Sequence, residues 1–190
     1  QDLDGDDISD ESGHSVAINQ DGSIVAIGTP GDDGFGGDNG SVRVFENISG
    51  NWVQMGSTLF GVNQADNLGY SVSLSNNGDI IAIGARNYLN NDPGYARVYS
   101  FVNGDWTQLG QDIVHPNLNE QFGYGVSICG NGNTLAVSLN QCLSCSTSSF
   151  QGGAVKIYSF NETSQWELIG NDILTLSASN NSNISIALSK

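Results

Sequence analysis

The chain has 190 residues, including 25 glycines and only three prolines, and this length is sufficient to bury a substantial core. Its formal net charge is −15 with only five Lys and Arg residues, so it lacks the basic patch that nucleic acid or an anionic membrane surface requires. No apolar run approaches the roughly 20 residues of a membrane span, which argues against membrane insertion.

Two strands joined by a tight turn are predicted three times along the chain. The three copies read GHSVAINQDGSIVAIGT at 13–29, GYSVSLSNNGDIIAIGA at 69–85 and GYGVSICGNGNTLAVSL at 123–139. Large and small residues alternate in the first part of each copy, as in a strand with two different faces. A turn containing Gly follows, and then an apolar run typical of a strand that is covered on both faces.

Two further strands are predicted after each of these hairpins. The third strand reads VRVF from Val42, ARVY from Ala96 and VKIY from Val155. The fourth begins at the three tryptophans of the chain, Trp52, Trp106 and Trp166, which are 54 and 60 residues apart. The longer second interval comes mostly from a loop at 140–153, since surface loops tolerate insertions. No segment shows a convincing helical period.

Four antiparallel strands repeated every 40–60 residues predict the blades of a β-propeller. We expect one propeller segment over 1–190, with repeat units at about 1–56, 57–110 and 111–170 and a partial unit at 171–190. The last unit contains NISIALSK, which aligns with the first strand of a blade. Three blades cannot close a ring, so we expect further blades of the same chain, or another chain, to cover the two end faces.

These motifs resemble the FG-GAP-type repeats of extracellular β-propellers. The resemblance is carried by SGHSVAINQDGSIVAIGTP, RVFENISGNWVQMG and RVYSFVNGDWTQLG, and it covers essentially the whole chain. It is closest to calcium-loop-poor varieties from surface proteins of marine bacteria and algae, with integrin α-subunit propellers as distant relatives. The resemblance implies six to eight blades in total. The family's Asp-rich calcium loop is replaced by NQDGS, NNGDI and GNGNT, so calcium binding there is not expected.

One acidic, glycine-rich loop is a candidate calcium site, and otherwise no cofactor is expected. The loop GTPGDDGFGGDNGS carries Asp32, Asp33, Asp38 and Asn39, whose oxygens are the ligands that calcium prefers. The equivalent loops of the other two copies lack these carboxylates. A solvated glycine loop is therefore the leading interpretation.

The cysteines and sequons bear on the compartment. In an oxidising environment Cys142 and Cys145 form the simplest disulfide, which leaves Cys129 buried and unpaired. Candidate glycosylation sites are Asn47, Asn161, Asn180 and Asn183. The acidic, Lys-poor composition is typical of a secreted protein, and we expect an extracellular or cell-surface location. The sequence starts either after a removed signal peptide or inside a longer protein.

The remaining charged and aromatic residues suggest structure rather than catalysis. Arg43, Arg97 and Lys156 share one repeat position, so we expect each stem to pack on a neighbouring strand while its charge finds a carboxylate or carbonyl. His14 stands where the other copies have Tyr, His115 precedes a proline, and neither has a catalytic partner at a recognisable spacing.

The sequence therefore favours a non-enzymatic extracellular propeller for adhesion, which binds a protein or glycan at a cell surface. The alternative is a building block of a secreted surface filament or appendage. A propeller hydrolase or lyase ranks last, because it would need an acid/base pair that is unique to one copy.

Overall fold

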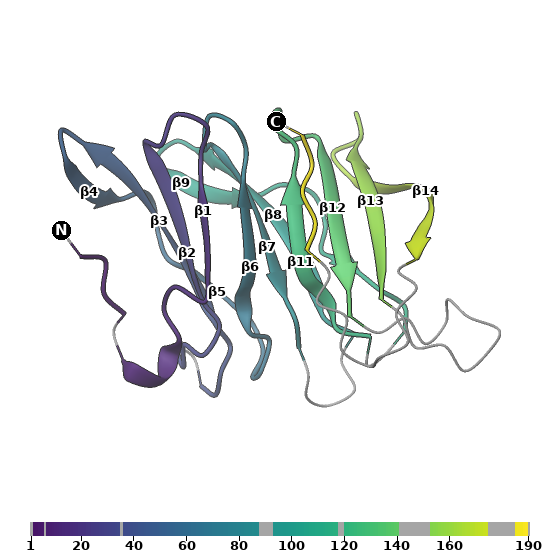
Figure 1. Ribbon diagram of the computed structural model, residues 1–190, viewed down its shortest axis with the longest axis horizontal. Helices are drawn as coiled ribbons and strands as arrows, with labels where there is room; N and C mark the ends of the chain where they lie inside the picture. Colours follow the sequence, from purple (N-terminus) through teal and green to yellow (C-terminus); the bar gives the residue numbers. More distant parts are fainter. Residues whose placement is uncertain are drawn as a thin grey trace.

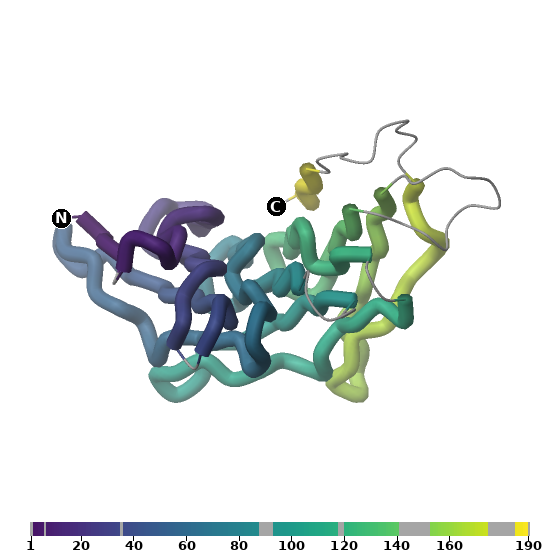
Figure 2. The backbone as a smooth tube through the Cα atoms, turned by 90° about the horizontal axis from the view of Figure 1, so that it is seen from below, coloured from purple at the N-terminus to yellow at the C-terminus, as the bar shows by residue number. Residues whose placement is uncertain are grey.

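The computed structural model describes residues 2–5, 7–34, 36–87, 93–117, 120–140, 153–174 and 185–189. Three antiparallel sheets follow one another in chain order along the long axis of the molecule (Figures 1 and 2). One 3-10 turn, η1 (Ile8–Asp10), precedes the first sheet. The expected all-β, propeller-like fold with four-stranded antiparallel sheets is confirmed. Among the described residues, no helix has the length and apolar character needed to cross a membrane.

Each sheet contains the four predicted strands in sequence order. The first contains β1 (Ser15–Ile18), β2 (Ile24–Thr29), β3 (Ser41–Ile48) and β4 (Asn51–Gln54), with β5 (Leu59–Phe60) beside β3. The second contains β6 (Leu68–Leu74), β7 (Ile80–Ala85), β8 (Tyr95–Val102) and β9 (Asp105–Gln108), with β10 (Ile113–Val114) beside β8. The third contains β11 (Phe122–Ile128), β12 (Thr134–Leu139), β13 (Ala154–Phe160) and β14 (Trp166–Leu174). The short strands β5 and β10 follow the Trp strand in the sequence. They nevertheless pair with the third strand of the same sheet, β3 or β8.

The turn between the first two strands has the same construction in every sheet. Gly78 adopts a φ of +77°, which an L side chain rarely tolerates. The residue that opens each turn accepts a hydrogen bond from the backbone N–H of the residue that starts the next strand. These pairs are Asn19 with Ile24 at 3.0 Å, Ser75 with Ile80 at 3.0 Å and Cys129 with Thr134 at 3.1 Å. Side-chain acceptors of different chemistry therefore fill one structural role.

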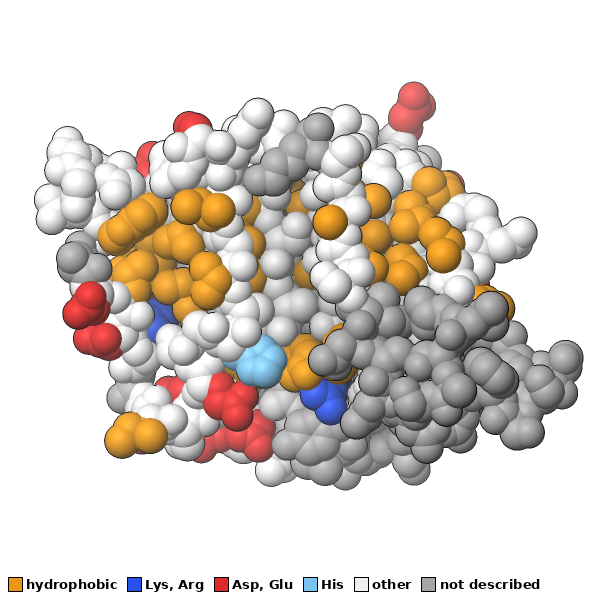
Figure 3. Space-filling model, viewed as in Figure 1, with side chains coloured by type: hydrophobic (Ala, Val, Ile, Leu, Met, Phe, Trp, Pro, Cys, Tyr) orange, Lys and Arg blue, Asp and Glu red, His pale blue; other side chains and the backbone are white. Residues whose placement is uncertain are grey.

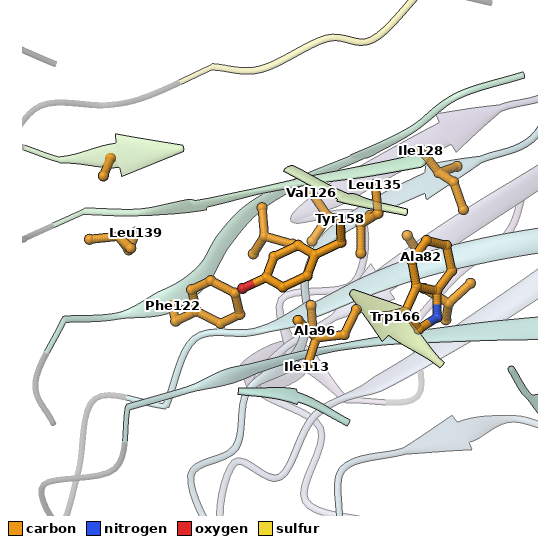
Figure 4. Packing of buried hydrophobic residues seen from close by; sticks show 13 residues of the cluster. Ala82, Ala96, Ile113, Phe122, Val126, Ile128, Leu135, Leu139, Tyr158 and Trp166 are labelled. Carbon is orange, nitrogen blue, oxygen red and sulfur yellow. The ribbon is translucent and has the colours of Figure 1, made fainter. Parts of the chain in front are cut away.

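The core consists of two clusters, each between two successive sheets. The first joins β2 and β3 to the second sheet, and the other joins the second sheet to the third. Strand β7 shows why its sequence is continuously apolar: Ile81 and Ile83 face the first sheet, while Ala82 faces the third. Figure 4 shows the second cluster, in which Trp166 lies beside Ala82.

The tryptophan that starts the fourth strand also links neighbouring sheets. The indole N–H of Trp106 donates to the carbonyl of Met55 in the first sheet at 2.7 Å, and that of Trp166 donates to Leu109 in the second at 2.8 Å. Both rings are buried. Trp106 and Trp166 therefore each combine apolar burial with one polar contact to the preceding sheet.

Residues 185–189 lie along β11, as Figure 1 shows in yellow. The backbone N–H of Leu188 donates to Oγ of Ser127 at 2.9 Å. The same bond joins the second and third sheets, where the N–H of Ile128 donates to Oγ of Ser73 at 3.1 Å. The segment thus makes the contact that the inner strand of a following sheet would make.

Candidate functional site

A pocket of about 330 Å³ opens where the inner strands β1 and β6 begin. Its lining combines acidic, basic, aromatic and amide side chains and includes Glu11, His14, Asp38, Asn67, Tyr70 and Arg86. Figure 3 shows a histidine with acidic side chains on one side and a basic side chain on the other. Such a concave group of unlike polar residues is a candidate binding or catalytic site.

Three aromatic rings, one from each sheet, form a row at this end of the inner strands. The ring of His14 lies 4.6 Å from that of Tyr70, which lies 5.3 Å from that of Tyr124. The strands are close enough for this because Gly28 has no side chain: a Cβ there would stand 2.1 Å from the carbonyl oxygen of Gly69. The repeat therefore places equivalent residues side by side.

Arg86, which directly follows β7, lies over two of these rings. Its guanidinium carbon is 4.6 Å from the ring centre of Tyr70 and 5.4 Å from that of Tyr124. Its Nη1 also donates a hydrogen bond of 2.6 Å to the hydroxyl of Tyr70. Burial raises the pKa of Tyr124, and a hydrogen bond with Tyr70 raises it further. The arginine is thus held at a fixed place in the pocket by stacking and hydrogen bonding.

His14 has a carboxylate neighbour, Glu11, which no spacing in the sequence marked as a catalytic partner. Nδ1 of His14 lies 3.4 Å from Oε2 of Glu11. The two side chains remain 32% and 64% exposed, so both are accessible to a small molecule. Glu11 stands at the end of η1 with a positive φ of 57°, and this turn directs it back toward His14. A carboxylate on Nδ1 orients an imidazole so that Nε2 can accept a proton.

The second histidine, His115, contacts one of three buried carboxylates that the sequence did not single out. Asp10, Asp66 and Glu120 stand at the same repeat position, two residues before SG, LG and FG, and all three are buried. Asp66 accepts a 2.8 Å hydrogen bond from the hydroxyl of Tyr95, and Glu120 lies 2.9 Å from Nδ1 of His115. The sequence does carry a signal for these residues, because an acidic residue stands at the same offset from the glycine in all three copies.

Two of these buried carboxylates, Asp10 and Asp66, organise the connections that lead into β1 and β6. Oδ2 of Asp66 accepts hydrogen bonds of 2.9 Å from the backbone N–H groups of Val62 and Asn63. Asp10 accepts one of 3.0 Å from the N–H of Asp7, which caps η1. Their first role is therefore to satisfy backbone donors beneath the pocket.

The four candidate calcium ligands make hydrogen bonds within their own part of the fold. Asp32 accepts from the N–H of Gly34 at 2.8 Å and from the hydroxyl of Ser41 at 2.6 Å, and Asp33 accepts from the N–H of Asp38 at 2.7 Å. The amide of Asn39 is buried and donates to the carbonyl of Gly61 at 2.9 Å. Within the described ranges, no group of three or more His, Cys, Asp or Glu residues is arranged to hold a metal ion.

The repeated basic residues each contact an oxygen. Arg97 makes two hydrogen bonds of 2.7 Å to the carboxylate of Asp112, and its guanidinium lowers the pKa of that carboxyl group. Lys156 contacts Asp172 at 2.6 Å, whereas Arg43 donates to the carbonyl of Asp4 at 2.8 Å. None of the three lines the pocket.

The cysteine and glycosylation predictions are only partly within the described residues. Cys142, Cys145, Asn180 and Asn183 lie outside them. Asn47 is exposed and accepts from the N–H of Gly50 at 2.8 Å, and Asn161 donates to Glu167 at 2.6 Å. Cys129 is half-buried at the turn of its hairpin, which corrects the prediction that it would be buried. Burial raises the pKa of its thiol, but backbone N–H groups led by that of Thr134 outweigh this and lower it.

Solved structures of low sequence identity share the fold. A protein of Bacteroides fragilis, provisionally named as a 6-phosphogluconolactonase, is similar over 87% of this chain and 40% of its own, with a TM-score of 0.52 and 18% identity. A Bacteroides uniformis protein with the same provisional name matches over 90% and 44%, with a TM-score of 0.53 and 16% identity. A hypothetical selenium-binding protein of Sulfolobus tokodaii matches over 84% and 40%, with a TM-score of 0.54 and 10% identity. No protein-family model and no curated protein matches the chain.

The chain spans about two fifths of the length of these solved structures, and identities of this size show a common fold alone. They correct the expected non-catalytic adhesion function, because two of the proteins with this fold are named as lactonases. The same names point away from the prediction that the chain is no enzyme. The FG-GAP resemblance extends only as far as an all-β, propeller-like fold, since no family model matches.

Proposed function

We propose that this chain belongs to a hydrolase that opens small cyclic esters at the pocket of Glu11, His14 and Arg86. The observation that carries this proposal is that a carboxylate–imidazole pair and a ring-held arginine line one pocket. The lactonase names of two proteins with the same fold support the same reaction class by analogy.

The chemistry follows from the arrangement of the pair. With Nδ1 of His14 directed to Glu11, Nε2 accepts a proton from a water molecule, whose oxygen attacks the carbonyl carbon of the lactone. The guanidinium of Arg86 stabilises the oxyanion that forms. The bond from carbonyl carbon to ring oxygen then breaks, and the proton on Nε2 passes to that oxygen. The products are an open-chain hydroxy acid and a regenerated imidazole.

We further propose that the three sheets belong to a propeller of six to eight blades in an extracellular protein. The contact of Leu188 with Ser127, which repeats the contact between the second and third sheets, supports a following blade. The exposed Val16 and Ile18 support a preceding one. The greater length of the solved structures agrees with both.

The activity is tested by the ring opening of glucono-δ-lactone. The rate of acid release is measured and compared with the rate in buffer alone. His14→Tyr is the sharpest variant, because the other two sheets carry Tyr at this position and the aromatic row is kept. We expect kcat/KM to fall by roughly 100- to 10,000-fold, the usual contribution of a general base. Glu46→Gln, at the exposed far end of β3, is the control and should keep the wild-type rate. A wild-type rate equal to that of buffer over a panel of lactones, or an active His14→Tyr variant, overturns the proposal.

A further inference from the structure

The pocket lies in a strongly acidic part of the molecule. Glu11 and Asp38 line it, and Asp10 lies buried in the adjoining turn. Burial raises the pKa of Asp10, a hydrogen bond from the backbone N–H of Asp7 opposes this, and the negative charges of Asp32, Asp7 and Asp33 add smaller upward shifts. Carboxylates at this end of the sheets are thus close enough to act on one another.

Only one cation balances this charge among the described residues of the pocket. Arg86 lines it, while Arg43, Arg97 and Lys156 contact other parts of the sheets. The whole chain carries a net charge of −15. A phosphate group would bring roughly two further negative charges beside Glu11 and Asp38, and that repulsion is not offset by a single guanidinium.

The same side chains suit a neutral ligand with several hydroxyl groups. The carboxylates of Glu11 and Asp38 accept hydrogen bonds from hydroxyls. Nδ2 of Asn67 already donates to the carbonyls of Pro30 and Asp38, but its buried Oδ1 has no hydrogen-bond partner among the described residues and can accept from a hydroxyl. Arg86 donates from a planar group that can serve two adjacent oxygens. A sugar-like ring supplies hydroxyl donors and acceptors without adding charge.

We infer that the pocket selects an unphosphorylated, neutral polyhydroxylated ring and excludes its phosphorylated form. This inference rests on the proposed function, whose substrate class it names. It departs from the phosphorylated substrate that the names of the two Bacteroides proteins imply for those proteins. The acidic residues of the pocket determine the selectivity.

The test is a binding measurement that needs no turnover. Calorimetry compares 1,5-anhydro-D-glucitol, a cyclic polyol without a carbonyl, with its 6-phosphate. We expect the neutral ring to bind at least about tenfold more tightly at 20 mM salt. The ratio should shrink at 0.5 M salt, because salt screens the repulsion between exposed charges. A phosphate that binds as tightly as the neutral ring, or no binding of either, overturns the inference.

Two matched variants separate local charge from total charge. Asp38→Asn removes one negative charge at the pocket and should raise the affinity for the phosphate relative to the neutral ring by roughly three- to tenfold. Glu46→Gln removes the same charge at the other end of β3 and should leave that ratio unchanged. An equal effect of both variants contradicts a local role for the pocket acids. Binding of the neutral ring without any lactone hydrolysis refutes the proposed hydrolase and leaves this inference intact.

Discussion

The first and second sheets carry nearly the same inner hairpin in opposite surroundings. Val16 and Ile18 of β1 are 59% and 54% exposed. Leu74, which takes the place of Ile18 in the second sheet, is 4% exposed, and Ile128 in the third is 3% exposed. The side chains are of the same kind, and the difference is the presence of a preceding sheet. Burial in this molecule is therefore a property of sheet pairs, as in other repeat proteins.

The largest expected effect comes from truncating Leu74, the residue of this pair that a neighbouring sheet covers. Leu74→Ala should lower the free energy of unfolding by about 2–5 kcal/mol, because it removes packing against the first sheet and leaves a cavity. Ile18→Ala should cost less than about 1 kcal/mol in the 190-residue chain, because its side chain is already exposed. Urea unfolding of both variants measures the difference.

The same pair sharpens the proposal of a larger propeller. In a longer natural protein with a preceding blade, the cost of Ile18→Ala should rise to the range of Leu74→Ala. Equal small costs of Ile18→Ala in the short chain and the longer protein would show that nothing covers β1.

The next largest effect is expected at the close approach between the strands of the second and third sheets. A Cβ at Gly84 would stand 2.1 Å from the carbonyl oxygen of Gly123, so Gly84→Ala should push the second and third sheets apart and cost about 1–3 kcal/mol or more. The third sheet has Ser138 at this position, where a Cβ is already accommodated. Ser138→Ala is the control, with an expected cost below about 1 kcal/mol. Thermal unfolding that ranks the two variants in the opposite order would contradict this account.

Local patterns predicted the strands and turns well. The alternation in Tyr70, Val72 and Leu74 and the glycine turn at Gly78 depend only on nearby residues, and the structure contains the strand β6 and the positive-φ turn that they predict. The position of Trp106 was predictable because the repeat marks it. These features need no knowledge of what packs across the sheets.

The pocket could not be predicted in the same way. Arg86 reaches a site that also contains Glu11 and His14, and more than 70 residues separate them in the sequence. Only the stacking of the sheets brings these residues together. The buried carboxylates were different, since Asp66 and its equivalents recur at a fixed offset, but in the sequence they resemble ordinary loop acids.

A smaller loss of stability is expected when two of the repeated basic residues are replaced. Arg97 forms a two-bond ion pair with Asp112, and the Arg97 side chain is 12% exposed, whereas Arg43 donates to a backbone carbonyl near the start of the chain. Arg97→Ala should cost about 1–2 kcal/mol and Arg43→Ala less than about 1 kcal/mol. Chemical denaturation of the two variants measures the ranking. An unchanged stability of Arg97→Ala would show that this repeat position is not structural.

The smallest expected effect compares how the second and third sheets satisfy their buried carboxylates. Asp66 uses the hydroxyl of Tyr95, while Glu120 uses the imidazole of His115, which can take up a proton. Burial lowers the pKa of His115 below its ordinary value of 6.5; the charge of Lys156 also lowers it, and that of Glu120 opposes the shift.

The sign of the pH dependence follows from that lowered pKa. Below about pH 6.5 the unfolded chain binds a proton that folded His115 does not, so stability falls as pH decreases through this range. His115→Gln removes the titrating group and should flatten the loss between pH 7.5 and pH 5, whereas Tyr95→Phe should leave the slope as in the wild type. Urea unfolding midpoints at pH 7.5 and pH 5 give the stability lost on acidification by each protein, and the losses of the variants are then compared with that of the wild type. A His115→Gln variant that loses as much stability on acidification as the wild type would show that the pH dependence does not come from His115.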